Sequence, residues 1–105
     1  MMGKKVYEII KVTVPFDKVG EFNEYWAREA LPIWLKHGVK HIGSFINYVG
    51  DPTNEIIRLF EFDSISHWEQ WEEFTASDSE EARNLFKGIS QYIARVEKKL
   101  LLSAF

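Results

Sequence analysis

Cysteine is absent from this sequence of 105 residues. Its absence excludes disulfide bonds, thiolate catalysis and cysteine-ligated metal sites, and it fits a reducing compartment. Long apolar runs are also missing: none approaches the ~20 residues of a membrane-spanning helix, so we expect no membrane insertion. We expect no signal peptide, because the first residues run directly into a predicted strand, and we expect a cytoplasmic protein.

Basic residues are in the minority. The 13 Lys and Arg against 16 Asp and Glu give a formal net charge of −3. No basic stripe with interleaved aromatic residues is present, so we do not expect a nucleic-acid partner. The sequence also contains no nucleophile elbow, phosphate-binding loop, zinc-ligand spacing or dinucleotide fingerprint. Common motifs therefore point neither to a metal site nor to a particular reaction.

Aromatic residues, in contrast, are abundant. They make up 15% of the chain, with four Trp and eight Phe. A chain of this length forms one domain, residues 1–105, and buries roughly two-thirds of its unfolded surface. The aromatic residues have two interpretations: a core together with a subunit interface, or the wall of a cavity for an apolar ligand.

Apolar periodicity and turn residues predict the secondary structure. Strands are predicted over residues 4–14, 39–49, 54–62 and 95–105, and helices over residues 17–37, 64–74 and 79–93. Asp17 is the expected N-cap of the first helix, and Pro32 predicts a kink or restart near Leu31. Gly38 is expected to end that helix in a left-handed conformation. The turn between the second and third strands is expected over residues 50–53, which include Asp51 and Pro52.

The resulting order is β-α-β-β-α(α)-β. It predicts a ferredoxin-like α+β fold, in which helices cover one face of a four-stranded antiparallel sheet. Each predicted strand nevertheless carries apolar residues on both faces. A second copy of the chain, packed sheet to sheet as a homodimer, would cover the remaining face.

The sequence resembles the NIPSNAP family within the dimeric α/β-barrel superfamily. The residues that carry the resemblance are Tyr7-Glu8-Ile9, Lys36-His37-Gly38, Gly43, Gly50, Asn54 and the run Ile56-Ile57-Arg58-Leu59-Phe60-Glu61-Phe62-Asp63-Ser64. The resemblance covers nearly the whole chain and implies a homodimer with a barrel-like core. Family members often have an arginine where this chain has Ile10, and Trp and Tyr where it has Phe60 and Phe62. The resemblance implies no catalytic residue.

The three histidines have different expected roles. His37 lies at the end of the first predicted helix, where a cation interacts favourably with the helix dipole. His67 is adjacent to Trp68 and is expected on the surface. His41 lies in the middle of a predicted strand, as a structural histidine or as part of a site.

Arg58 lies on an apolar strand face between Ile56 and Phe60. A buried guanidinium needs a partner, because an unpaired buried charge is costly. Glu8, another acid or a dimer contact would satisfy it within the protein. Alternatively, Arg58 anchors the carboxylate or other oxyanion of a ligand.

The neighbours of Arg58 depend on the hairpin register, because a slip of one residue reverses the faces of a strand. Pairing Val49 with Asn54 places His41, Phe45 and Asn47 beside Arg58. Pairing Val49 with Glu55 instead places Ile42, Ser44, Ile46 and Tyr48 there. We favour the first register.

These residues predict a homodimer that binds an apolar or amphipathic ligand, fatty-acid-like or aromatic, between helices and sheet. The expected site has Arg58, His41 and Asn47 at its polar end and Phe60, Phe62, Trp34 and Trp68 as its apolar wall. The superfamily resemblance also implies cofactor-independent monooxygenases, isomerases and haem-handling proteins as an alternative. No cofactor is otherwise expected, and a haem protein would need His41 or His37 as axial ligand. A structural or stress-related dimer without a ligand is the third interpretation.

Overall fold

The structure is a computed structural model that describes residues 4–50 and 52–104. Its strands and helices are β1 (Val6–Thr13), α1 (Val19–Tyr25), α2 (Leu31–Lys36), β2 (Lys40–Ile46), β3 (Glu55–Phe62), α3 (Ile65–Thr75), α4 (Glu80–Ser90) and β4 (Arg95–Leu102). A 3₁₀ turn (Phe16–Lys18) precedes α1, and a π-helical segment (Trp26–Ala30) joins α1 to α2. Asp51 of the expected turn and Phe105 of the expected last strand lie outside the described residues.

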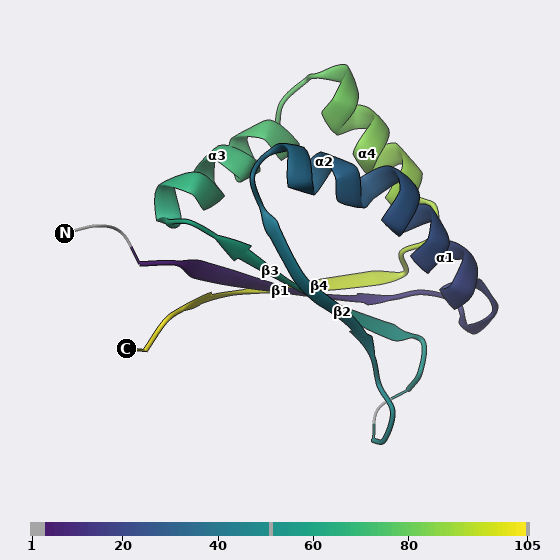
Figure 1. Cartoon of the computed structure of the whole chain (residues 1–105). Helices are drawn as coiled ribbons and strands as arrows, with labels where there is room; N and C mark the ends of the chain where they lie inside the picture. The colour runs from purple at the N-terminus through teal and green to yellow at the C-terminus, as the bar shows by residue number, and fades with distance from the viewer. Residues whose placement is uncertain (1–3, 51, 105) are drawn as a thin grey trace.

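The four strands form an antiparallel sheet in the order β2-β3-β1-β4. All helices lie on one face of this sheet, and the β2–β3 hairpin extends beyond them (Figure 1). This arrangement confirms the predicted ferredoxin-like fold. No helix of the described residues is long and apolar enough to cross a membrane.

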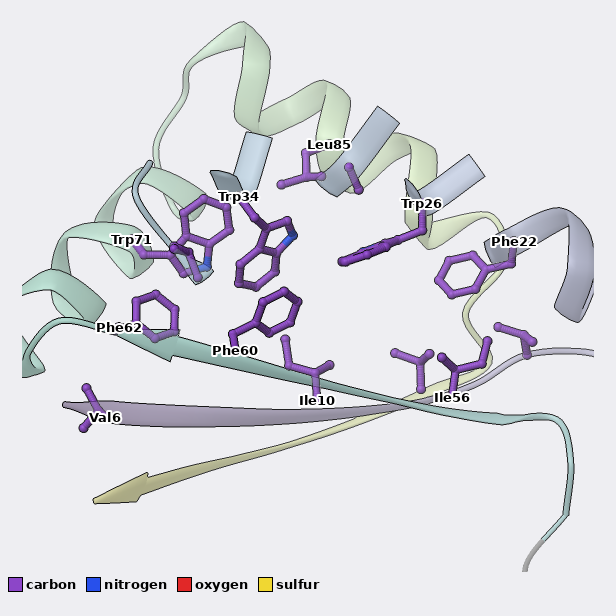
Figure 2. Packing of buried hydrophobic residues seen from close by; sticks show 14 residues of the cluster. Val6, Ile10, Phe22, Trp26, Trp34, Ile56, Phe60, Phe62, Trp71 and Leu85 are labelled. Atoms are coloured by element: carbon purple, nitrogen blue, oxygen red, sulfur yellow. The ribbon is translucent and has the colours of Figure 1, made fainter. Parts of the chain in front are cut away.

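The core lies between the helices and the sheet, because alternate residues of β1 and β3 point toward the helices. Phe60 is fully buried, and the ring of Trp34 stacks on it with 4.0 Å between centroids and 4° between planes. Trp71 of α3 packs against Trp34 at 4.2 Å. Figure 2 shows this aromatic column between the helices and the sheet, with Trp26 and Phe22 farther along it. Core packing therefore accounts for much of the aromatic content.

The first helical region is interrupted as the proline predicts. The π-helical segment ends at Ala30, and α2 restarts at Leu31 with Pro32 in its first turn. Proline cannot donate a backbone hydrogen bond, and its ring disfavours a regular preceding turn, so the wider π turn accommodates it. The expectation that Asp17 caps this helix is wrong, because its side chain makes no cap hydrogen bond and lies in the 3₁₀ turn. The carbonyl of Pro15 instead accepts from the backbone N–H of Lys18 at 2.9 Å.

Other helix ends match the sequence signals. The Ser64 hydroxyl accepts from the backbone N–H of His67 at 3.1 Å, and the Ser79 hydroxyl accepts from that of Ala82 at 3.2 Å. Both are N-cap hydrogen bonds. Gly38 has φ +78, which confirms its expected left-handed conformation.

The second strand is shorter than predicted. It ends at Ile46 rather than at residue 49. Asn47 turns inside the hairpin, where its Nδ2 donates to the carbonyl of Pro52 at 2.8 Å and to Oε1 of Glu55 at 3.0 Å. These bonds close the loop at Asn47, three residues before the predicted turn begins, and they replace ladder pairing.

Tyr25 of α1 lies against Gly88 of α4. A Cβ atom on Gly88 would collide with the phenol of Tyr25. The same tyrosine ring packs against Tyr92 at 5.7 Å. Glycine leaves room for the tyrosine ring here, and a side chain at position 88 would require the phenol to move.

Candidate functional site

The β2–β3 register changes within the hairpin. His41 pairs with Phe60, whereas Ser44 pairs with Arg58, because a bulge lies between His41 and Gly43. Residues directly opposite in an antiparallel pair share a face, and the extra residue of a bulge changes the face of all that follow. His41 and Ser44 therefore both lie on the face of Arg58, which is the face covered by helices.

Neither expected register is the one observed. Pairing Val49 with Asn54 would place His41 opposite Phe62, but His41 lies opposite Phe60. This displacement of two residues keeps His41 on the expected face, whereas the expected places of Phe45 and Asn47 are wrong. Phe45 pairs with Ile57 on the opposite face, and Asn47 closes the loop. The alternative register would pair Ser44 with Phe60, but Ser44 lies opposite Arg58. The bulge is the physical reason that both residues face the helices, because it leaves His41 on the face expected from the first register and Ser44 on the face expected from the second.

Arg58 is buried, with 4% of its surface exposed. Its Nη1 donates to the Ser44 hydroxyl at 2.7 Å, and its Nη2 donates to Oδ1 of Asn23 at 3.0 Å. The guanidinium carbon lies 3.7 Å from the centroid of the Trp26 ring, a cation–π contact. Burial lowers the pKa of Arg58 to about 10, so the side chain is still charged at neutral pH. All these partners are neutral.

Glu8, the expected rival partner, lies elsewhere. The register of β1 on β3 places Ile10, not Glu8, opposite Arg58. Glu8 is 2% exposed, and its Oε2 accepts from the indole N–H of Trp68 at 3.1 Å. Burial raises the pKa of Glu8. Within residues 4–50 and 52–104, Arg58 therefore has no carboxylate partner, and Oε1 of Glu8 has no hydrogen-bond partner.

His41 and Ser44 form a hydrogen bond of 2.7 Å between Nε2 and Oγ. Oγ accepts from Arg58, and it donates its own proton to Nε2 of His41 in the tautomer that carries its hydrogen on Nδ1. Burial, and then the neighbouring Arg58 charge, lower the pKa of His41. His41 is therefore a neutral base at neutral pH.

Two cavities of about 320 Å³ each meet at Arg58 and Trp26, which line both. The first cavity lies between the π-helical segment and β2, and its lining includes Asn23, Trp26, His41, Ser44, Ile56 and Arg58. The second lies between α3, α4 and the sheet, and its mostly apolar lining includes Trp34, Arg58, Phe60, Leu85, Ile89 and Lys98. Both volumes are at the low end of the ~300–1,000 Å³ typical of ligand sites.

The predicted site residues are divided between the two cavities and the core. Trp34 and Phe60 line the second cavity with Arg58, whereas His41 lines the first. Phe62 is fully buried in the core, and the indole of Trp68 is engaged by Glu8. Asn47, Phe62 and Trp68 are not among the residues that line either cavity.

Sequence reasoning did not identify Asn23; it assigned Trp26 to the core, or to the wall of a slot if the helices stand off the sheet. The available signal was helical spacing, since residues three apart share a helix face and Asn23 precedes Trp26 by three. A polar side chain at that position faces the same neighbours as the tryptophan. A polar residue on this otherwise apolar helix face therefore indicates that the sheet presents a polar side chain opposite it, which is Arg58 in the structure.

The other two histidines lie outside both cavities. Nε2 of His37 is 3.5 Å from Oε1 of Glu81, and its ring packs on Phe74 at 4.1 Å. The expectation that His67 lies on the surface is wrong. Its Nε2 is 2.8 Å from the carbonyl of His37, and its side chain is 16% exposed, because it fills the space beside Gly38.

These positions do not suit a haem. The Nε2 atom of His41 is occupied by Ser44, and His37 faces Glu81 and Phe74 rather than a cavity. An axial ligand needs a free imidazole nitrogen directed into a large pocket. Within the part of the chain that the structure describes, no group of three or more His, Asp or Glu could hold a metal ion.

Comparison with known proteins places this geometry in a family. The sequence profile of the NIPSNAP family matches residues 7–104. No curated protein matches the sequence. The fold is similar to that of a NIPSNAP domain protein from Burkholderia xenovorans, with 21% identity, 94% of each chain covered and a TM-score of 0.81.

It is also similar to a NIPSNAP family protein from Agrobacterium tumefaciens str. C58, with 20% identity, 99% of this chain and 95% of that chain covered, and a TM-score of 0.78. The "Putative antibiotic biosynthesis monooxygenase" from Nitrosomonas europaea shares the fold at 10% identity, with 100% of this chain and 95% of that chain covered and a TM-score of 0.68. The family profile spans nearly the whole sequence, and this chain belongs to the NIPSNAP family.

Proposed function

We propose that this protein is a homodimer that binds a small amphipathic carboxylate, fatty-acid-like or aromatic, in the second cavity, with the carboxylate on Arg58. The observation that carries the proposal is a buried guanidinium whose partners are all neutral. Two of the five N–H groups of an arginine donate to Ser44 and Asn23, which leaves donors for a ligand. A carboxylate accepts such donors in pairs and neutralises the buried charge.

The second cavity supplies the apolar end. Leu85 and Ile89 of α4 and Phe60 of the sheet form its wall, and Arg58 lies beside them. Lys98 of the exposed strand β4 provides a second cation at this cavity. A volume of about 320 Å³ favours medium-chain over long-chain carboxylates.

The homodimer is supported by the sheet face opposite the helices. Half-buried Ile9, Ile57 and Leu59 lie on that face, and every helix lies on the other. Lys11, on the same face, is 3.5 Å from both Glu55 and Glu97. An apolar centre flanked by side chains of both charges suits a contact in which the same surface of two copies meets around a two-fold axis.

The test of the ligand site is Arg58→Leu. Medium-chain carboxylates titrated into the full chain by calorimetry should bind the variant at least tenfold more weakly, about 1.4 kcal/mol. Arg83→Leu is the matched control, because Arg83 is exposed on α4 and pairs only with the exposed Asp78 in the described structure. Equal binding by wild type and Arg58→Leu, or binding by neither, would reject the site.

An enzyme of the cofactor-independent monooxygenase or isomerase type is the second candidate. The observation that favours it is the neutral His41, a base that lines a cavity beside a guanidinium. Such a base would remove a proton from a ligand whose negative charge Arg58 stabilises. Oxygen uptake by the purified protein with small phenolic substrates tests this candidate, and equal uptake by His41→Gln would exclude His41 as the base.

A further inference from the structure

Two backbone irregularities border the first cavity. The π-helical segment contributes Trp26 and Ala27 to its lining, and the bulged part of β2 contributes His41 and Ser44. Both kinds of irregularity recur at functional sites, where they redirect side chains. In a regular strand, residues three apart would face opposite sides of the sheet. The bulge alone allows His41 and Ser44 to meet.

We propose that Ser44 and His41 are a nucleophile and its base, which cleave small carboxylic esters in the first cavity. The required contacts are present: Oγ of Ser44 is 2.7 Å from Nε2 of His41, and Arg58 donates to the same Oγ at 2.7 Å. A hydroxyl becomes a nucleophile when a neighbouring base accepts its proton. The guanidinium stabilises the negative charge that develops on Oγ as its proton passes to His41.

The reaction balances with water as the only co-substrate. Oγ of Ser44 attacks the carbonyl carbon of the ester while its proton passes to Nε2 of His41. The bond from that carbon to the alkoxy oxygen breaks, and the leaving alkoxide takes the proton from His41. Water then attacks the acyl-serine with His41 again as the base, which releases the carboxylic acid and restores the Ser44 hydroxyl.

The carbonyl oxygen gains negative charge in both steps and needs donors. Asn23 lines the same cavity, and its Oδ1 already accepts from Arg58, so its amide N–H₂ group is directed away from the guanidinium. This amide and the N–H groups of Arg58 not bound to Ser44 or Asn23 are the donors we assign to the oxyanion.

The lining of the first cavity defines the substrate class. Ala27, Leu31, Ile46 and Ile56 are apolar, and the volume is about 320 Å³. Ser44 is exposed, so a substrate reaches it from solvent. These features fit a small ester with a short apolar acyl group rather than a peptide or a charged acyl donor.

The test uses p-nitrophenyl acetate and p-nitrophenyl butyrate on the full chain. We expect a burst of nitrophenolate and a mass increase of one acyl group on the peptide that contains Ser44. Ser44→Ala should remove both, and His41→Gln should slow acylation by a factor of ~10²–10⁴. Ser66→Ala, at an exposed serine of α3, is the matched control and should behave as wild type.

Two further measurements separate this site from the carboxylate site and from a structural role. The acylation rate should rise with pH and reach half its maximum below pH 6.5, the ordinary pKa of histidine, because burial and Arg58 lower the pKa of His41. Ser44→Ala, with a circular dichroism spectrum like that of wild type, should still bind medium-chain carboxylates. Acylation of lysines without Ser44, or equal rates in wild type and Ser44→Ala, would overturn the proposal even if carboxylates bind at Arg58.

Discussion

At the scale of single residues, two ionisable side chains are buried on neighbouring strands but do not form an ion pair with each other. Glu8 lies opposite Phe60, and Arg58 lies opposite Ile10. Both are at most 4% exposed. The sequence indicates that Arg58 is buried, because its neighbours on the strand face are apolar. Its counterparts were not predictable, because they depend on which residues the sheet register and the helix bring across from it.

Glu8 gives a stability prediction with a defined sign. Burial raises its pKa, the Trp68 hydrogen bond and Lys98 lower it, and Glu72 raises it. A carboxyl whose pKa is raised in the folded protein contributes fully to the free energy of unfolding below its pKa in the unfolded chain, near 4.5. That contribution is lost as the pH rises through the pKa of the folded protein, because the unfolded chain then binds fewer protons than the folded one. Glu8→Gln should therefore stabilise the protein near pH 7.

Urea unfolding between pH 4 and pH 8 measures this effect. The gain in Glu8→Gln at pH 7 should exceed the ~0.5 kcal/mol of ordinary surface substitutions and should shrink toward pH 4. Glu73→Gln, at an exposed position of α3, should leave the pH dependence unchanged. A Glu8→Gln variant less stable than wild type at pH 7 would show that the native carboxylate is charged and satisfied.

At the scale of helices and strands, some sequence signals depend only on nearby residues, whereas others depend on distant parts of the chain. Pro32 and Gly38 act within a few residues, and both predictions were confirmed. Asp17 failed because the chain closes a 3₁₀ turn on the Pro15 carbonyl before α1 begins. The β2 bulge was not predicted, because both faces of this strand carry apolar residues and the change of face therefore leaves no visible break in the pattern. Gly43, next to the bulge, was the available signal, since a glycine inside a strand often marks one.

The N-cap of α4 provides a second prediction. Ser79→Ala removes the hydrogen bond from the backbone N–H of Ala82 and should cost about 1 kcal/mol. For a domain of this size that loss lowers the melting temperature by ~4–8 °C. Ser66→Ala, inside α3, keeps every N-cap intact and should change the melting temperature little. Equal melting of the two variants would show that the Ser79 cap does not contribute.

At the scale of the whole molecule, the order of strands and helices was predictable because it rests on repeated patterns. Alternation along β1 and β3 and the capping residues of α3 and α4 all agree with one fold. The cavities were less predictable. They arise where the π-helical segment and α4 stand off the sheet, and this spacing depends on contacts between distant parts of the chain.

Assembly provides the prediction at this scale. Sedimentation velocity at micromolar concentration should give a dimer, and its interface should bury more than the ~1,200–2,000 Å² of a standard specific contact. Leu59→Glu places a charge on the sheet face away from the helices and should yield monomers. Leu35→Glu, at an exposed position of α2, should remain dimeric. A wild-type monomer would contradict the sheet-to-sheet assembly.

The contact between Tyr25 and Gly88 has an evolutionary consequence. Because the phenol occupies the space that a Cβ on Gly88 would need, Gly88 is not free to change while the tyrosine keeps this position. A lineage that acquires a side chain at position 88 must replace the tyrosine with a smaller residue or turn its phenol away from α4. The two sites should therefore be inherited as a correlated pair, and a descendant that has lost the tyrosine is the one in which the glycine is also free to change.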